Sequence, residues 1–303
     1  MRTRQFTDTS NFFAIDYDDE ILIGGNRYIV KGYAHESRFG LEDPKYWVKR
    51  VVDSKTGEPK IIKLSFLESF ETSIGGVKIK RFRNPDKERK ILELVEGHPS
   101  FMHGEGQLDA KGNIVRILNV VRGPNFLNYL DRFKMNYEDY FQQILPGILK
   151  KIVQAFEAIR FLHINGFKHG DIRNDHILID GDKGTYVWID YDYDYEALEN
   201  PFSLDIFGMG NILTYAIGKG FHTLQMIMSE TRLYGDLIDR LERDDFSLLE
   251  KRRFINLRKL YPIIPTVLND ILMHFSQGAH VYYELAEELI EDLNRCLYSI
   301  FDR

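Results

Sequence analysis

Two short stretches in the middle of this 303-residue chain constrain its fold and chemistry more than any other part. HGDIRNDHILID, residues 169–180, and VWIDYD, residues 187–192, each join a short apolar run, typical of a strand, to a polar loop. Each loop carries an aspartate, Asp171 and Asp190. The two carboxylates are suited to hold a substrate hydroxyl and a metal ion, so we expect the chemistry of the protein to lie there.

The composition is that of a large globular protein without a strong charge signature. A chain of this length that is 44% hydrophobic and 13% aromatic can bury a substantial core, in one large domain or in two lobes. The formal net charge is −6, which argues against nucleic acid or an anionic membrane as a general partner.

The sequence also predicts a cytoplasmic protein. Cys296 is the single cysteine and cannot form an internal disulfide, which suits a reducing compartment. No run of about 18 apolar residues occurs, and no apolar stretch follows the two N-terminal arginines. We therefore expect no membrane-spanning segment.

After an N-terminal extension, residues 1–19, the chain predicts mainly strands as far as residue 121. KYWVKRVVDSKTGEPKIIK, residues 45–63, alternates as a hairpin does and turns near Gly57. A helix is expected over 84–96, with Asn84 as its N-cap and Pro85 at its first position.

From residue 122 to the end the chain predicts mainly helices. One begins near Pro146 and ends at Gly166, a residue that favours helix C-termini. Further helices are expected over 204–217, 222–242, 247–258, 264–275 and 279–298, the last with Val281, Leu285, Leu289 and Leu293 toward the core. The basic clusters at 78–83 and 251–253 are expected to be solvated.

The two central stretches resemble motifs of the protein-kinase-like superfamily. HGDIRNDH is similar to the catalytic loop H-R-D-x-K-x-x-x-N, and DYD at 190–192 is similar to the metal-binding D-F-G. The resemblance implies an α+β, bilobal fold with a small β-rich N-lobe, residues 20–121, and a larger, mostly helical C-lobe, residues 122–303. It also implies that ATP and Mg²⁺ bind between the lobes.

The same resemblance assigns the catalytic and phosphate-binding roles. Asp171 would orient the substrate hydroxyl and accept its proton, and Arg173 would replace the lysine that steadies the γ-phosphate. Lys63, which ends a strand, would hold the ATP phosphates. Glu88 would pair with Lys63, with Glu93 as the alternative.

Other implied contacts are structural or use backbone groups. Gly32, Ala34 and Ser37 stand at the spacing of the phosphate-covering loop, although glycine occupies only the first of these places. Leu118 would lie behind the adenine, and the backbone from Asn119 to Val121 would pair with the adenine edge. His169, Tyr191 and Asp205 are expected to support the two motif loops.

Three departures from the family pattern leave the function open. His176 replaces the asparagine that binds a second metal; it either binds a metal, which would favour Mn²⁺, or only packs in the loop. Asp192, in place of the glycine of D-F-G, belongs either to a solvated loop or to a metal site. Gly170 replaces an arginine, and fifteen residues separate Asp190 from Asp205, a short segment.

We therefore expect an ATP-dependent phosphotransferase that acts on a hydroxyl, with protein serine or threonine as the first candidate acceptor. Two alternatives remain open. The short segment after Asp190 favours a small-molecule kinase of the choline or aminoglycoside kinase type. The incomplete glycine loop and His176 favour a pseudokinase that acts as a binding or scaffold module.

Overall fold

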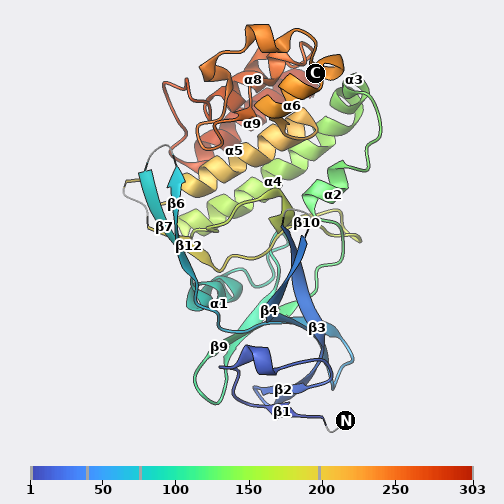
Figure 1. Cartoon of the computed structure of the whole chain (residues 1–303), viewed down its shortest axis with the longest axis vertical. Helices are drawn as coiled ribbons and strands as arrows, with labels where there is room; N and C mark the ends of the chain where they lie inside the picture. Colours follow the sequence, from blue (N-terminus) through green and yellow to red (C-terminus); the bar gives the residue numbers. More distant parts are fainter. Residues whose placement is uncertain (1–2, 39–40, 75–76, 197–198, 302–303) are drawn as a thin grey trace.

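The computed structural model describes residues 3–38, 41–74, 77–196 and 199–301 and divides into two lobes (Figure 1). The N-terminal lobe is built on a β-sheet with the α-helix α1 (Pro85–Leu94), and the C-terminal lobe is mostly helical. The bilobal α+β architecture expected from the sequence is confirmed.

Seven strands of the described part of the N-lobe form one sheet. In spatial order these are β1 (Gln5–Phe6), β2 (Glu20–Ile23), β3 (Asn26–Arg38), β4 (Leu41–Asp53), β5 (Pro59–Lys63), β9 (Ile114–Asn119) and β8 (Gly104–Leu108). Apolar side chains from alternate positions, among them Ile21, Val30, Val51 and Ile62, form a buried core under this sheet. Because β1 pairs with β2, part of the expected N-terminal extension belongs to the sheet.

Two local predictions in the N-lobe are confirmed. Strands β4 and β5 form an antiparallel hairpin, and Gly57 in its turn has φ +72°, a conformation that glycine adopts at little cost. The Asn84 side chain accepts a hydrogen bond from Lys87 N at 3.0 Å, and Pro85 opens α1, so the predicted N-terminus of the helix is also correct.

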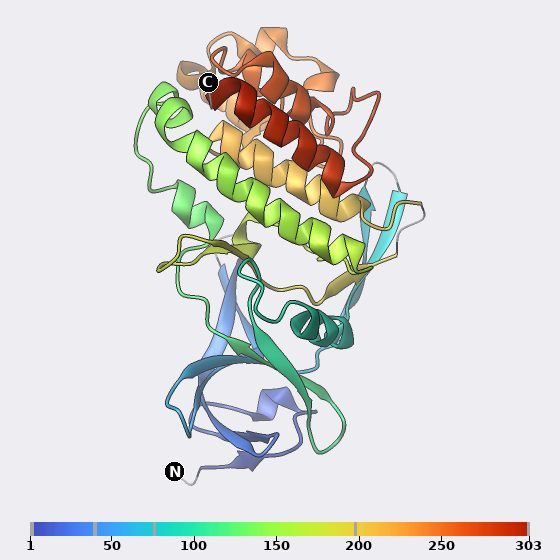
Figure 2. The same cartoon turned by 180° about the vertical axis from the view of Figure 1, so that it is seen from behind.

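A second hairpin, which the sequence did not predict, connects the lobes. It consists of β6 (Ser69–Ile74) and β7 (Val77–Arg83) and lies between the strand of Lys63 and α1. Strand β7 pairs with β12 (Tyr193–Tyr195), which follows the DYD motif, so that Tyr195 lies opposite Arg81. Figures 1 and 2 show this hairpin leaving the N-lobe and lying beside the helical lobe near α5.

The C-lobe is centred on α4 (Leu145–Ile164), whose buried stripe includes Ile148, Ile152, Phe156 and Ile159. Around it lie the other principal helices, α2 (Phe126–Leu130), α5 (Ser203–Gly218), α8 (Thr266–Met273) and α9 (Ala286–Phe301). The described residues include no helix long and apolar enough to cross a membrane.

Three expectations in the C-lobe are wrong. Residues 222–242 form β13 (His222–Thr223), α6 (Leu224–Ser229), α7 (Thr231–Tyr234) and a 3-10 turn, because Gly235 at φ +56° ends α7. Residues 247–258 contain β14 (Arg253–Phe254), paired with β13, instead of a helix. The last helix begins at Ala286, which leaves Val281 and Leu285 exposed, 65% and 51%, outside the core.

Each of the two central sequence stretches contains strand residues, and the two strands pair with each other. Strands β10 (Ile177–Ile179) and β11 (Tyr186–Trp188) form a two-stranded antiparallel sheet at the junction of the lobes. The loops that carry Asp171 and Asp190 precede β10 and follow β11, respectively. This pairing brings the two aspartates to the same end of the small sheet.

Candidate active site

Lys63 at the end of β5 is held by α1 through a buried ion pair. Its Nζ lies 2.8 Å from Glu88 Oε1, and the other oxygen of Glu88 accepts a hydrogen bond from Arg116 Nε at 3.0 Å. Glu93, the alternative partner, instead pairs with Arg89 at the surface. The structure therefore brings Lys63 and Glu88 together.

Lys63 is also in contact with the carboxylates that follow β11. Its Nζ donates to Asp190 Oδ1 and lies 3.4 Å from Asp192 Oδ2. Burial alone would lower the pKa of Lys63, but the charges of Asp190, Asp192 and Glu88 outweigh burial and raise it. Lys63 is therefore a charged ammonium group at neutral pH.

The prediction that Asp192 belongs to a solvated loop is wrong. It is 1% exposed, and Arg83 Nη1 donates to both of its oxygens, at 3.0 and 2.9 Å. Arg116 Nη2 lies 3.8 Å away. The site of the family glycine thus holds a buried carboxylate that is neutralised by arginines.

Asp205 near the start of α5 holds the backbone of the loop that carries Asp171. Its two oxygens accept hydrogen bonds from Gly170 N at 2.9 Å and from His169 N at 2.7 Å. His163 Nε2 lies 3.1 Å from the same carboxylate. Burial would raise the pKa of Asp205, but the hydrogen bond and charge of His163 lower it, so the carboxylate stays ionised.

His169 packs behind the loop, with its ring centroid 5.1 Å from that of Trp188 and 5.7 Å from that of Tyr191. Complete burial lowers the pKa of His169 to about 4, so the imidazole is neutral at physiological pH. Tyr191 is also buried, and its hydroxyl donates to the backbone oxygen of Met102. Both side chains pack in the core behind the two loops.

Gly170 is a glycine because β12 passes directly over it. Its φ is +88°, and a Cβ atom there would lie 1.8 Å from the backbone oxygen of Tyr193. No other residue fits without moving the strand. The family motif has an arginine at this position. Here β12, which pairs with the β6–β7 hairpin, leaves no room for a side chain.

Asp171 is paired with a cation from that hairpin. Arg81 Nη2 donates to Asp171 Oδ1 at 2.7 Å and to Gly170 O at 2.9 Å. Burial would raise the pKa of Asp171, but the nearby His176, Arg81 and Arg173 lower it, so this residue is an ionised carboxylate. Arg81 belongs to the cluster at 78–83, so the expectation that this cluster is solvated is wrong for Arg81 and for the buried Arg83.

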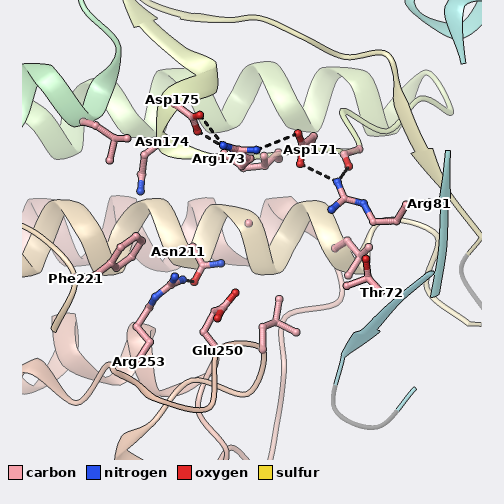
Figure 3. Close-up of a pocket in the computed structure, with 16 residues that line it drawn as sticks. Thr72, Arg81, Asp171, Arg173, Asn174, Asp175, Asn211, Phe221, Glu250 and Arg253 are labelled. Atoms are coloured by element: carbon pink, nitrogen blue, oxygen red, sulfur yellow. Dashed lines mark hydrogen bonds and ion pairs between the residues drawn. The ribbon is translucent and has the colours of Figure 1, made fainter. Parts of the chain in front are cut away.

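Arg173 lies beside the carboxylates of Asp171 and Asp175. It donates to both oxygens of Asp175, at 3.0 and 2.7 Å, and its Nη1 lies 3.9 Å from Asp171 Oδ2 (Figure 3). The bidentate pair fixes the plane of the guanidinium. Arg173 and Arg81 therefore approach different oxygens of the same carboxylate.

His176 lies between the two aspartates. Its Nδ1 is 2.8 Å from the backbone oxygen of Asp171, a contact in which the nitrogen must be the donor. The other ring nitrogen, Nε2, lies 3.6 Å from Asp190 Oδ2. His176 is thus oriented as a metal-binding histidine would be.

Asp190 has a strained backbone. Its φ is +66°, in the left-handed region that residues with side chains seldom adopt. Burial would raise its pKa, but Lys63 and His176 lower it well below the usual value. One carboxylate oxygen of Asp190 pairs with Lys63, and the other faces His176.

Three adjoining cavities meet at these residues. A cavity of about 510 Å³, called here the nucleotide cavity, is lined by residues of both lobes, including Ala34, Val48, Lys63, Leu118, His176 and Asp190. A second cavity, of about 460 Å³ and called here the acceptor cavity, lies on the other side of Asp171 (Figure 3). A small cavity of about 80 Å³ lies between them and is lined by both aspartates.

Only some of the remaining expected ATP-binding residues line the nucleotide cavity. Ala34 lines the nucleotide cavity, whereas Gly32, which follows a bulge in β3, is not among its described lining residues. The side chain of Ser37 lies outside the part of the chain that the structure describes. Asn119 ends β9 and Val121 lies two residues further along the chain, but neither is among the described residues that line the cavity.

Comparisons with known proteins agree with this architecture. No protein-family model matches the chain. The ovarian-specific serine/threonine-protein kinase Lok of Drosophila melanogaster is 25% identical over 185 residues, which cover 58% of this chain and 33% of that kinase. The chain thus aligns with about a third of the length of this relative.

A solved structure shares the fold over most of the chain. The kinase PK-1 of Cydia pomonella granulovirus superposes with a TM-score of 0.52 at 14% identity, covering 88% of this chain and 93% of that one. One assignment follows from the two lobes, the order of the elements and these similarities. The chain has the protein-kinase fold, and part of its sequence is similar to a serine/threonine-protein kinase.

Proposed function

We propose that the protein is an ATP- and metal-dependent phosphotransferase that moves the γ-phosphoryl group of ATP to a hydroxyl. The supporting observation is the arrangement of the three cavities. The small cavity shares Asp190 and His176 with the nucleotide cavity, and it shares Asp171 and Arg81 with the acceptor cavity. A phosphoryl group that leaves the nucleotide at the small cavity is therefore next to the acceptor cavity.

Each charged group at this junction has a defined task in that reaction. Lys63 is a rigid cation on the wall of the nucleotide cavity and binds the phosphates. Asp171 orients the acceptor hydroxyl; because its pKa is low, it takes the proton late, when the new P–O bond is largely formed. Arg81 and Arg173 stabilise negative charge on the phosphoryl oxygens.

The residues present also fit a divalent metal that is shared with the nucleotide. Asp190 Oδ2 and His176 Nε2 face each other and are the protein donors for such an ion. Among the described residues no three acidic, histidine or cysteine side chains converge to form a complete site. This suits Mg²⁺ or Mn²⁺, which take their other ligands from phosphates and water and neutralise the phosphate charge.

Two classes of hydroxyl acceptor have support. The relative in Drosophila is named as a serine/threonine-protein kinase, which favours a protein serine or threonine. A small-molecule acceptor is favoured by the acceptor cavity, since Thr72 and Arg81 of the hairpin wall one side of it and residues 249–253 wall the other. A peptide would have to enter between these two segments.

The proposal is tested with purified protein, γ-labelled ATP, and Mg²⁺ or Mn²⁺. The wild type should bind the metal-nucleotide complex in a thermal-shift titration and transfer label to water, to protein or to small hydroxyl compounds. Asp190→Asn should weaken nucleotide binding. Asp171→Asn should bind ATP normally and lower turnover by a factor on the order of 10².

Similar, modest effects of both substitutions would contradict the roles assigned to the two aspartates. Nucleotide binding by the wild type without any turnover, under conditions in which Asp190→Asn loses binding, would support the pseudokinase alternative instead.

A further inference from the structure

The acceptor cavity contains a cation that the reaction described above does not use. Figure 3 shows Asp171, Arg173 and Asp175 on one side of the cavity and Asn211, Glu250 and Arg253 on the other. Arg253 comes from the cluster at 251–253, which was expected to be solvated. That expectation is wrong for this residue, because its side chain is half-buried in the wall of the cavity.

Arg253 differs from the other two arginines of the cavity in its partners. Arg81 is paired with Asp171, and Arg173 is paired with Asp175. The Arg253 guanidinium instead donates to the neutral Asn211 Oδ1 at 2.8 Å and stacks 3.7 Å from the ring centroid of Phe221. Among the described residues no carboxylate oxygen lies within 4.0 Å of it.

The fold fixes this guanidinium next to the catalytic loop. Arg253 lies in β14 opposite Thr223, and Phe221 immediately precedes β13, so the pairing of these two strands brings the stacked pair together. Asn211 lies on α5 one turn after Gly208. A Cβ at Gly208 would lie 2.6 Å from Ile172 Cβ, so α5 approaches the loop of Asp171 closely at this point.

A half-buried guanidinium whose hydrogen-bonding and stacking partners are neutral has the chemistry to bind an anion. Arginine remains protonated at any ordinary pH, and its fork of donors matches carboxylate and phosphate groups. The aromatic ring and the amide hold the fork in place without neutralising it. The charge is thus available to a bound molecule that reaches across the cavity.

We propose that the acceptor carries a carboxylate or phosphate group, which Arg253 binds while the acceptor hydroxyl lies at Asp171. This inference rests on the proposed phosphotransfer and names its substrate class. In the reaction the acceptor oxygen forms a bond to the γ-phosphorus, the bond to the ADP oxygen breaks, and the hydroxyl proton passes to Asp171. The anionic group does not react and serves to position the acceptor.

Glu250 provides a second, opposite test of the same idea. It lines the cavity beside Arg253, is exposed, and carries a negative charge that repels an anion. Arg253→Gln should therefore weaken the binding of an anionic acceptor, whereas Glu250→Gln should strengthen it. The adjacent Arg252 is exposed and does not line the cavity, which makes Arg252→Gln a matched control.

The experiment compares acceptors that differ in one charge. The small-molecule arm uses glycerate and glycerol 3-phosphate against glycerol, and the peptide arm uses serine peptides flanked by glutamate against the same peptides with glutamine. Transfer from γ-labelled ATP and equilibrium binding in the presence of ADP and metal are both measured. The arm that responds identifies the source of the anionic group.

We expect the wild type to prefer the charged member of a pair. Arg253→Gln should lower kcat/KM and binding for that member on the order of 10-fold or more, with the neutral member and the KM for ATP unchanged. Arg253→Lys should be intermediate, because lysine keeps the charge but not the fork. An ATP thermal shift equal to that of the wild type shows that each variant is folded.

The outcomes separate this inference from the proposed function. Transfer that is indifferent to acceptor charge, or equal in the wild type and Arg253→Gln, overturns the anion site and leaves phosphotransfer intact. Binding of the anionic probes that depends on Arg253, without any transfer, supports the site and contradicts the phosphotransferase. Absence of both binding and transfer for every anionic probe overturns the anion site.

Discussion

Arg81 and Asp171 are 90 residues apart in the sequence, yet Arg81 Nη2 lies 2.7 Å from Asp171 Oδ1. The contact exists because β7 pairs with β12, which runs past the catalytic loop. Arg81 is also fixed by the rings of Phe70 and Tyr193, with its guanidinium carbon 5.6 and 5.3 Å from their centroids. A cation from an extra hairpin of the N-lobe thus lies beside the carboxylate of the proposed reaction centre.

We predict that Arg81→Ala lowers kcat about 10-fold or more and leaves the KM for ATP unchanged. The phosphoryl group in transfer loses a cation, whereas the nucleotide cavity does not include Arg81 among its lining residues. Lys80→Ala is the control, because Lys80 lies on the same strand and pairs with Glu196 at the surface. Steady-state kinetics test this prediction, and a rise in kcat would show that Arg81 restrains Asp171 instead.

The Lys63–Glu88 pair should matter for both activity and stability. Lys63→Met should lower turnover on the order of 10², because the ATP phosphates lose their cation. It should also cost about 3–5 kcal/mol in the free energy of unfolding, since buried carboxylates lose their partner. Glu88→Gln should have a smaller effect on turnover, because Lys63 keeps its contact with Asp190.

Glu93→Gln is the matched control for Glu88→Gln, since Glu93 lies on the same helix with its side chain 61% exposed. It should change neither turnover nor chemical denaturation. Full activity of Lys63→Met would mean that another cation binds the phosphates.

The parts of this site that depend on local pattern could be predicted from the sequence. Lys63 ends an alternating strand, Asn84 and Pro85 mark a helix start, and Asp171 and Asp190 flank two short apolar runs. Each of these signals is contained within a few residues. The structure places all of them at the junction of the lobes.

The cations and the buried carboxylate that complete the site could not be predicted in this way. Arg81, Arg83 and Arg253 look like members of solvated basic clusters, because the groups around them come from distant segments. Arg83 meets Asp192 across 109 residues of sequence, through the same β7–β12 pairing. A basic run near a strand of aromatic residues does not reveal that pairing.

The position of His176 predicts an unusual metal preference. Its Nε2 faces Asp190, and an imidazole nitrogen is a better ligand for Mn²⁺ than for Mg²⁺. We expect the wild type to turn over ATP faster with Mn²⁺ than with Mg²⁺ at saturating metal. His176→Asn should shift the ratio toward Mg²⁺, because an amide oxygen is a hard ligand, and His176→Ala should lower activity with both ions.

The ratio of rates with the two metals is the measurement, since it cancels differences in the amount of active protein. An unchanged ratio in His176→Asn would show that His176 only supports the loop through its hydrogen bond to the Asp171 backbone.

His169 should make the protein acid-sensitive in a defined range. Burial lowers its pKa from 6.5 to about 4, so between these values the unfolded chain binds a proton that the folded protein does not. Stability is therefore lost as the pH falls from about 6.5 to about 4, by roughly 3 kcal/mol for this group.

His169→Phe keeps ring contacts with Trp188 and Tyr191 but cannot titrate. Urea denaturation at pH 7 and pH 4.5 should show that the wild type loses more stability than His169→Phe, because the carboxylates common to both proteins cancel in the difference. Parallel losses in the two proteins would mean that His169 is protonated in the folded state, and hence that its surroundings are wetter than the packing of Trp188 and Tyr191 implies.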